Sequence, residues 1–194
     1  MYRLGPSIFR LASGVLDSWQ MPKIVHPFME QLAKNTGESV LLSVIDKDKG
    51  VMTYVDIVHS PHPVRYQIAV GTVRPLYAST AGRLLLAYAE RSWRHDYLAS
   101  VQFEVPTSAP MTRASLKREL DLIRQHELAW SVDGYMVGLS AVAAPLLDAN
   151  GECVACFNIA GPTDRTKANL ESLKGAVRAC AAQVSKALAA ADAD

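Results

Sequence analysis

Apolar residues recur at helical spacing in several parts of the chain. The first stretch follows Pro6, a favoured first residue of a helix, and places apolar residues from Ile8 to Trp19 on one face. The next begins near Pro22 and stops at the turn-prone residues 35–37. The two should pack against each other as a hairpin, because only a few residues separate them. The spacing predicts helices near residues 6–19, 22–35, 79–88, 92–101, 112–123 and 170–188.

Other segments are rich in β-branched residues, several with alternating polar positions, which is typical of strands. Residues 47–50 have the composition of a hairpin turn, and Asn150-Gly151 is the strongest short hairpin signal in the chain. Runs of antiparallel strands interrupted by helices predict an α+β fold, with a central antiparallel sheet of about six strands flanked by helices. The predicted strands are Ser39–Asp46, Val51–Val58, 64–70, 129–133, Leu139–Leu147 and 153–160.

Composition narrows the possible functions. The 194 residues are 49% hydrophobic and 20% charged, which is enough to fill the core of one domain. The net charge is +1, and the 20 lysines and arginines are scattered. A phosphate-binding surface needs clustered basic residues, so we expect no nucleic-acid binding by this chain itself.

The chain also has no signal for a membrane or an oxidising compartment. No apolar run approaches the roughly 20 residues that cross a bilayer, and Met1–Gly5 is followed by no secretory signal region. Three cysteines, an odd number, fit a reduced compartment better than a disulfide framework. We therefore expect a cytoplasmic protein with no membrane partner.

Four blocks of sequence resemble the IclR family of bacterial transcription regulators, and they occur in that family's order and spacing. The resemblance covers nearly the whole chain. The blocks are Tyr2-x-Leu4-Gly5, Pro75-Leu76-Tyr77-Ala78-Ser79-Thr80-Ala81-Gly82-Arg83-x-Leu85-Leu86-Ala87, Gly138-Leu139-x-x-x-Ala143-Ala144-Pro145-Leu146 and Ile159-Ala160-Gly161-Pro162.

The resemblance implies a GAF-like domain that binds a small metabolite as effector, here a small organic acid. It also implies self-association as a dimer or tetramer, and DNA binding through an N-terminal winged helix-turn-helix that this chain lacks. On this basis residues 1–20 are expected to be a linker and first helix, and residues 21–194 the effector-binding domain.

The helix start near Ser79 has a physical reason to bind an anion. The first N–H groups of a helix have no internal partners and lie at the positive end of its dipole, so the amides of Thr80, Ala81 and Gly82 can hold a carboxylate. These residues are small enough for a ligand to approach the backbone. Spacing alone favours an ordinary N-cap with nothing bound, whereas the resemblance favours the ligand site. Some relatives have Gly where this chain has Thr80, so ligand identity does not transfer simply.

The resemblance and strand alternation together give a set of pocket residues. Asn158, Cys156 and Ala160 should share one face of their strand, with Phe157 and Ile159 on the other. The predicted effector-binding residues are Tyr66, Ile68, Ser79, Thr80, Ala81, Gly82, Ser131, Asp133, Leu139, Ala141, Asn158 and Ala160.

Several of these assignments leave an alternative open. Asn158 could instead satisfy the core, and Asp133 could accept a hydroxyl of the ligand or point to solvent, the latter being favoured. Tyr66, Trp130 and Tyr135 would suit an aromatic acid, or could pack in the core or on the surface.

Other motifs carry no chemistry that we expect. Cys153 and Cys156 form a C-x-x-C, but on a regular strand they point to opposite faces, so neither a disulfide nor a shared metal fits unless the strand is broken. His59 and His62 lack further metal ligands nearby. No catalytic triad or dinucleotide motif occurs, so we expect no catalytic residues, no metal and no cofactor. An enzyme on the same pocket and a pure interaction module remain the alternative functions.

Overall fold

The computed structural model describes residues 20–104 and 110–191. The helix expected near 6–19 lies outside these ranges, and the division into a linker at 1–20 and a domain at 21–194 stays a prediction. The described elements are α2 (Gln20–Thr36), β1 (Ser39–Asp46), β2 (Val51–Val58), β3 (Val73–Pro75), α3 (Thr80–Tyr88), α4 (Arg91–Ser100), α5 (Arg113–His126), β4 (Ala129–Val132), β5 (Leu139–Leu147), β6 (Cys153–Pro162), α6 (Thr163–Ala168) and α7 (Leu170–Ala191).

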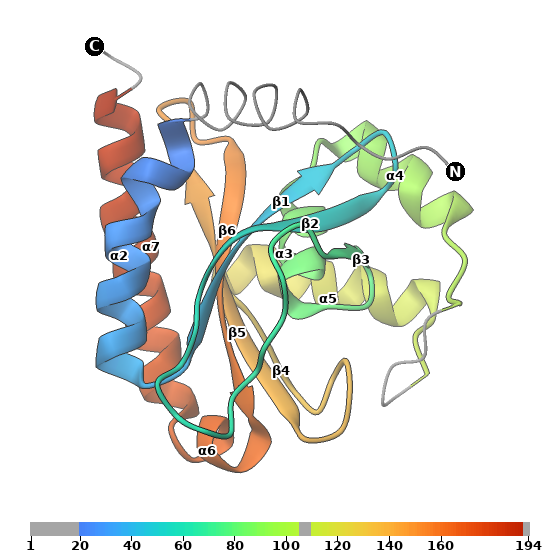
Figure 1. Cartoon of the computed structure of the whole chain (residues 1–194). Helices are drawn as coiled ribbons and strands as arrows, with labels where there is room; N and C mark the ends of the chain where they lie inside the picture. Colours follow the sequence, from blue (N-terminus) through green and yellow to red (C-terminus); the bar gives the residue numbers. More distant parts are fainter. Residues whose placement is uncertain (1–19, 105–109, 192–194) are drawn as a thin grey trace, which may run out of the picture.

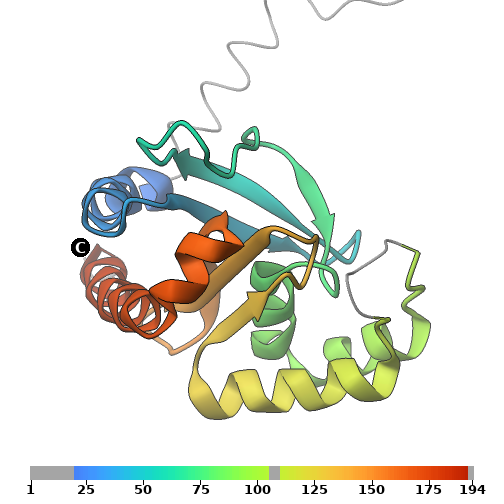
Figure 2. The ribbon, with the colours of Figure 1, turned by 90° about the horizontal axis from the view of Figure 1, so that it is seen from below.

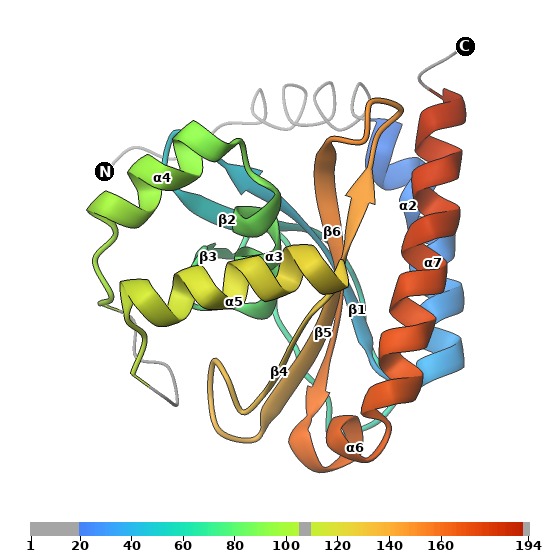
Figure 3. The ribbon, with the colours of Figure 1, turned by 180° about the vertical axis from the view of Figure 1, so that it is seen from behind.

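The strands form one six-stranded sheet in the order β3-β2-β1-β6-β5-β4, with every neighbouring pair antiparallel. The predicted α+β class and the sheet of about six strands are confirmed. Helices α2 and α7 lie side by side over one face, and α3 and α5 cover the other (Figures 1 and 3). The view from below shows the sheet between these two helical layers (Figure 2).

The two faces of the sheet carry side chains of different size, because neighbouring residues of a strand point to opposite faces. The core under α2 and α7 takes large side chains from β5 and β6, among them Leu146, Phe157 and Ile159. The core under α3 takes small ones, among them Ala141, Ala143, Cys156 and Ala160. The predicted division of β6 between its two faces is therefore confirmed. Small residues on this face allow α3 to lie close to the sheet.

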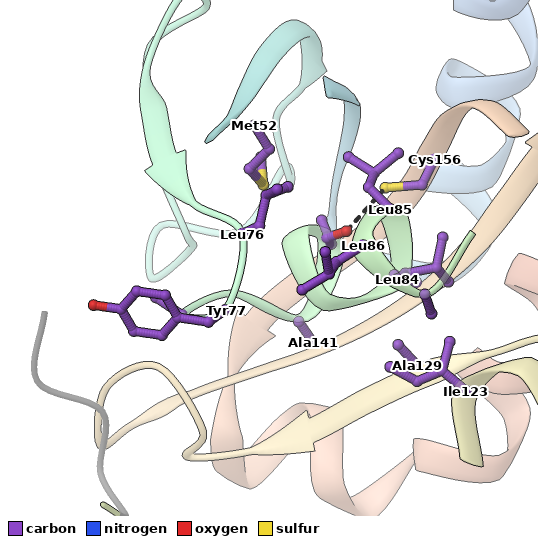
Figure 4. Packing of buried hydrophobic residues seen from close by; sticks show 14 of the residues in the cluster. Met52, Leu76, Tyr77, Leu84, Leu85, Leu86, Ile123, Ala129, Ala141 and Cys156 are labelled. Carbon is purple, nitrogen blue, oxygen red and sulfur yellow. Dashed lines mark hydrogen bonds between the residues drawn. The ribbon is translucent and has the colours of Figure 1, made fainter. Parts of the chain in front are cut away.

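Helix α3 is buried along almost its whole length, from Thr80 to Ala87. In Figure 4, Met52 and Leu76 lie on one side of the helix, and Ile123 and Ala129 lie on the other. The Cys156 thiol donates to the Ala81 carbonyl oxygen at 3.8 Å, which ties the helix to β6.

The strand predicted at 64–70 is wrong. The third strand is the short edge strand β3, and residues 59–72, here called the covering segment, contain no strand; its last residues, Gly71 and Thr72, make backbone hydrogen bonds with Tyr54 of β2. Pro61 and Pro63 cannot donate to a ladder. The carbonyls of Val64 and Tyr66 instead accept from the side chains of Arg165 (3.1 Å) and Ser39 (2.8 Å).

The alternation in the covering segment reflects partial burial rather than strand pairing. Tyr66 and Ile68 are half-buried, while their neighbours Arg65 and Gln67 are exposed. Val64 is 70% exposed, so the apolar residue at the start of the predicted strand does not pack against the domain. In Figure 1 the segment leaves β2, turns near α6 and returns to β3.

The C-x-x-C motif also departs from expectation. A bulge in β6 shifts the register between Leu146 and Leu147, which pair with Ala155 and Cys153. Cys153 therefore packs against the same core cluster as Cys156, and the prediction of opposite faces is wrong. Both cysteines are free thiols.

Candidate functional site

The N-terminus of α3 is fixed by Ser79. The Ser79 Oγ accepts a hydrogen bond from the Gly82 backbone N–H at 3.0 Å and donates to the Met52 sulfur at 3.1 Å. The N-cap interpretation is therefore correct for this residue. One of the three amides that we expected for a carboxylate is already satisfied within the protein.

Beside this helix start lies a narrow cavity between β3, the covering segment and the loop that joins β4 to β5. Its volume is about 20 Å³, which is room for roughly one water molecule. It is lined by Tyr54, Tyr66, Arg74, Ser79, Thr80, Ala81, Ser131, Tyr135, Leu139, Ala141, Asn158 and Ala160.

Nine of the twelve predicted residues line this cavity, and Ile68, Gly82 and Asp133 do not. Ile68 packs at the edge of the core under α3. Gly82 is needed for packing, since a Cβ there would meet the backbone of Leu76.

Asp133 closes its own loop instead of contacting a ligand. Its Oδ1 accepts from the Thr163 hydroxyl at 2.6 Å and from the Gly138 N–H at 2.7 Å. These hydrogen bonds lower the pKa of the carboxyl below its ordinary value, and the bond from Thr163 has the larger effect. Asp133 does not line the cavity, and its place among the effector-binding residues stays a prediction.

The structure bears on two alternatives left open by the sequence, the role of Asn158 and the placement of the aromatic residues. The Oδ1 of Asn158 accepts from the Ser43 hydroxyl at 3.3 Å, so this residue satisfies the core and also lines the cavity. Tyr66 and Tyr135 line the cavity, whereas Trp130 stacks with the Lys174 ammonium, 3.8 Å from its ring.

Sequence reasoning missed Tyr54 and Arg74. Tyr54 follows Met52 on the buried face of β2, and this alternation was visible in the sequence. Arg74 stands beside the Pro75-Leu76 block, and nothing in its spacing indicated that its side chain turns inward.

The cavity has one cationic side chain and no acidic one among its lining residues. The Arg74 Nε is buried and has no hydrogen-bond partner within the described part of the chain. The guanidinium carbon lies 5.4 Å from the centre of the Tyr135 ring. The electrostatic character of the cavity is therefore positive.

The remaining polar groups of the cavity are neutral. Burial, with a further contribution from Tyr66, raises the pKa of Tyr54 well above its ordinary value, so the phenol keeps its proton. The hydroxyls of Thr80 and Ser131 are 2.6 Å apart and share a hydrogen bond. The cavity thus offers hydroxyl groups and a guanidinium to a bound molecule.

Contacts beyond the cavity hold its cover in place. The buried Ser39 hydroxyl donates to the Tyr66 carbonyl and accepts from the Ser60 N–H at 3.0 Å. The Arg165 guanidinium pairs with the buried Glu38 carboxylate while it donates to the Val64 carbonyl.

A second, wider groove of about 430 Å³ lies between the 47–50 turn and α4. Its lining mixes Lys47 and Lys49 with Asp48 and Asp96, and it is open to solvent. Mixed charges on an open surface give no defined ligand chemistry, so the narrow cavity is the stronger candidate.

The described residues contain no group of three metal-ligating side chains and no helix able to cross a membrane. They form an α+β domain with a small polar cavity beside a helix N-terminus.

Comparison with known proteins gives the family. The family model described as "Bacterial transcriptional regulator IclR C-terminal" matches residues 13–186. The chain belongs to the IclR family and corresponds to its C-terminal, effector-binding domain.

Individual relatives agree with this assignment. The HTH-type transcriptional regulator Rv1719 of Mycobacterium tuberculosis is 32% identical, over 94% of this chain and 69% of its own length. A transcriptional regulator structure from Rhodococcus sp. RHA1 has a TM-score of 0.88 at 28% identity, covering 97% of this chain and 77% of that one.

One solved relative contains a ligand. An IclR homologue from Microbacterium hydrocarbonoxydans, crystallised with 4-hydroxybenzoate, has a TM-score of 0.84 at 21% identity, covering 97% of this chain and 76% of that one. At this identity the likeness concerns the fold. Among the curated relatives, this chain spans from 53% to 74% of their length.

Proposed function

We propose that this domain senses a small organic acid, which binds in the cavity beside the α3 N-terminus. The observation that carries the proposal is the charge of the lining, one arginine and no carboxylate, together with neutral hydroxyl donors. A carboxylate is stabilised by a cation and by hydroxyl donors in a site of low dielectric constant.

The size of the cavity connects binding to a change of conformation. About 20 Å³ accepts roughly one water molecule, so even a compact acid has to displace part of the lining. The covering segment and the loop at residues 133–138 are the elements that can move outward. An acid that binds the opened form more tightly shifts the population toward it.

In the complete regulator, which we place in the cytoplasm, this shift would change the packing between subunits. It would thereby change the spacing of the paired DNA-binding domains. Dimers or tetramers are part of this proposal. The 4-hydroxybenzoate in the Microbacterium homologue supports an organic acid, and an aromatic one in particular, as a ligand class to test here.

Thermal unfolding with a panel of aliphatic and aromatic carboxylates tests the proposal. A ligand that binds the folded state at 100 times its Kd stabilises it by about 2.7 kcal/mol. Ala81→Leu fills the cavity and should abolish this stabilisation, whereas Ala99→Leu, on the exposed side of α4, should keep it. No stabilisation of the parent by any acid, or an unchanged response of a folded Ala81→Leu variant, would contradict the proposal.

A further inference from the structure

Arg74 occupies an unusual place for an arginine. It is the middle residue of the short edge strand β3, where it pairs with Met52 of β2. Its side chain lines the cavity, and its Nε is buried without a hydrogen-bond partner in the described residues. A buried donor of a charged group that lacks a partner is costly, so such a group requires an explanation.

A comparison with Arg83 shows how the fold compensates the charge of a buried arginine. Arg83 is 3% exposed, and its Nε, like that of Arg74, makes no hydrogen bond of good geometry, but it lies 2.6 Å from a carboxylate oxygen of Glu119. Its guanidinium also donates to the carbonyls of Tyr77 (3.1 Å) and Ala78 (3.2 Å). Among the described residues that line the cavity, Arg74 has no carboxylate of this kind.

The aromatic neighbours of Arg74 do not replace an anion. Tyr135 offers a ring at 5.4 Å, a cation–π contact that compensates only part of the lost hydration of a guanidinium. Tyr54 keeps its proton, because burial raises its pKa, so it supplies no negative charge. The half-buried guanidinium of Arg74 therefore has no anionic partner among the residues that line the cavity.

Two groups could bind the anion, the amides at the α3 N-terminus and the Arg74 guanidinium, and the α3 N-terminus is the weaker candidate. Its Gly82 amide is already bonded to Ser79, and the Thr80 hydroxyl is bonded to Ser131. We infer that Arg74 is the anion anchor of this site and that the ligand class is the monocarboxylates, with the carboxylate on Arg74. This inference rests on the proposed function.

The restriction to one carboxylate follows from the charge count. One guanidinium compensates one carboxylate, and a second carboxylate in the same cavity would lie among neutral groups without a cation. The hydroxyl pair of Thr80 and Ser131 can instead bind a neutral oxygen of the ligand. Dicarboxylates should therefore bind more weakly than monocarboxylates of similar size.

Matched probe molecules and variants test the inference. Wild-type protein is screened by thermal unfolding at pH 7 with acetate, propionate, benzoate and 4-hydroxybenzoate, with their primary amides, and with succinate and phthalate. The acid with the largest effect is then titrated by calorimetry into wild type, Arg74→Met, Arg74→Lys and the control Arg118→Met, which alters an exposed arginine of α5.

We expect stabilisation by monocarboxylates and none by their amides. Loss of a charge-assisted interaction corresponds to roughly 10- to 100-fold weaker binding, which we expect for Arg74→Met. Arg74→Lys should be intermediate, because it keeps the charge but loses the planar fork. Arg118→Met should bind as wild type does. Without ligand, Arg74→Met should unfold close to the wild-type temperature, because it removes a half-buried charge that lies over the Tyr135 ring.

The outcomes separate this inference from the proposed function. If a monocarboxylate binds and Arg74→Met binds it equally well, or if amides bind as well as acids, Arg74 is not the anchor, while the sensing function stands. If wild type responds to none of the acids, the proposed function and this inference both fall. If Arg74→Met does not fold, Arg74→Lys and the comparison of acid with amide decide the question.

Discussion

Gly82 lies so close to Leu76 that a Cβ at residue 82 would be 2.8 Å from the Leu76 Cα and 2.9 Å from its carbonyl carbon. Gly82→Ala should therefore push α3 away from the preceding turn. Overpacking of this kind costs roughly 1–3 kcal/mol, which urea unfolding measures.

Gly175→Ala is the matched control, since a Cβ at this exposed position of α7 meets nothing within 4 Å. It should stabilise the protein by up to about 1 kcal/mol, because alanine favours a helix. Equal effects of the two substitutions would show that Gly82 is not required for packing.

Ser39 holds the covering segment at two points, the Tyr66 carbonyl and the Ser60 N–H. Ser39→Ala leaves the buried Ser60 N–H and the half-buried Tyr66 carbonyl without this partner, at a cost of about 1–3 kcal/mol. We expect faster amide hydrogen exchange in residues 59–72, measured by mass spectrometry of peptides from that region. Ser100→Ala removes an exposed hydroxyl bonded within α4 and should leave the exchange of that segment unchanged.

Asp133 should make stability depend on pH. Its pKa is lowered in the folded state by the hydrogen bonds from Thr163 and Gly138, so the ionised form is the stabilising one. This contribution is present above the unfolded value of about 3.9 and is lost as the pH falls through the lower folded value.

Asp133→Asn tests this dependence without disturbing the backbone, because asparagine also tolerates the positive φ of 54° at this position. Melting temperatures of the variant and of wild type should differ at about pH 6 and converge as the pH falls below the unfolded value of about 3.9 and through the lower folded pKa. A constant difference across this range would mean that the charge of Asp133 does not matter.

The cysteines should react slowly in the folded protein. Burial raises the pKa of the Cys153 thiol to about 12 and that of Cys180 to about 11, so little thiolate is present at neutral pH. Cys156 is fully buried, and its pKa is raised as well. A thiol-reactive dye should label the three cysteines much faster in denaturant. Rapid native labelling, or a Cys153–Cys156 disulfide under mild oxidation, would contradict this.

Local patterns predicted most elements of the fold correctly. Composition rich in β-branched residues, together with turn signals, located β1, β2, β5 and β6. Alternation then divided β6 between its two faces, because side chains alternate along any strand whatever it pairs with. The same rule failed at residues 64–70. A half-buried covering segment alternates like a strand, and only the partners of its carbonyl groups distinguish the two.

In the candidate site, too, some features follow from the local sequence and others from tertiary contacts. The helix start at Ser79 and the small residues of β5 and β6 could be predicted from sequence, because capping and strand alternation depend on neighbours along the chain. The bulge beside Cys153, the inward placement of Arg74 and the loop bonds of Asp133 depend on contacts between distant segments. The sequence determined where the cavity lies and which small residues form its floor; the tertiary structure decided which charge it contains, because that depends on which side chains meet there.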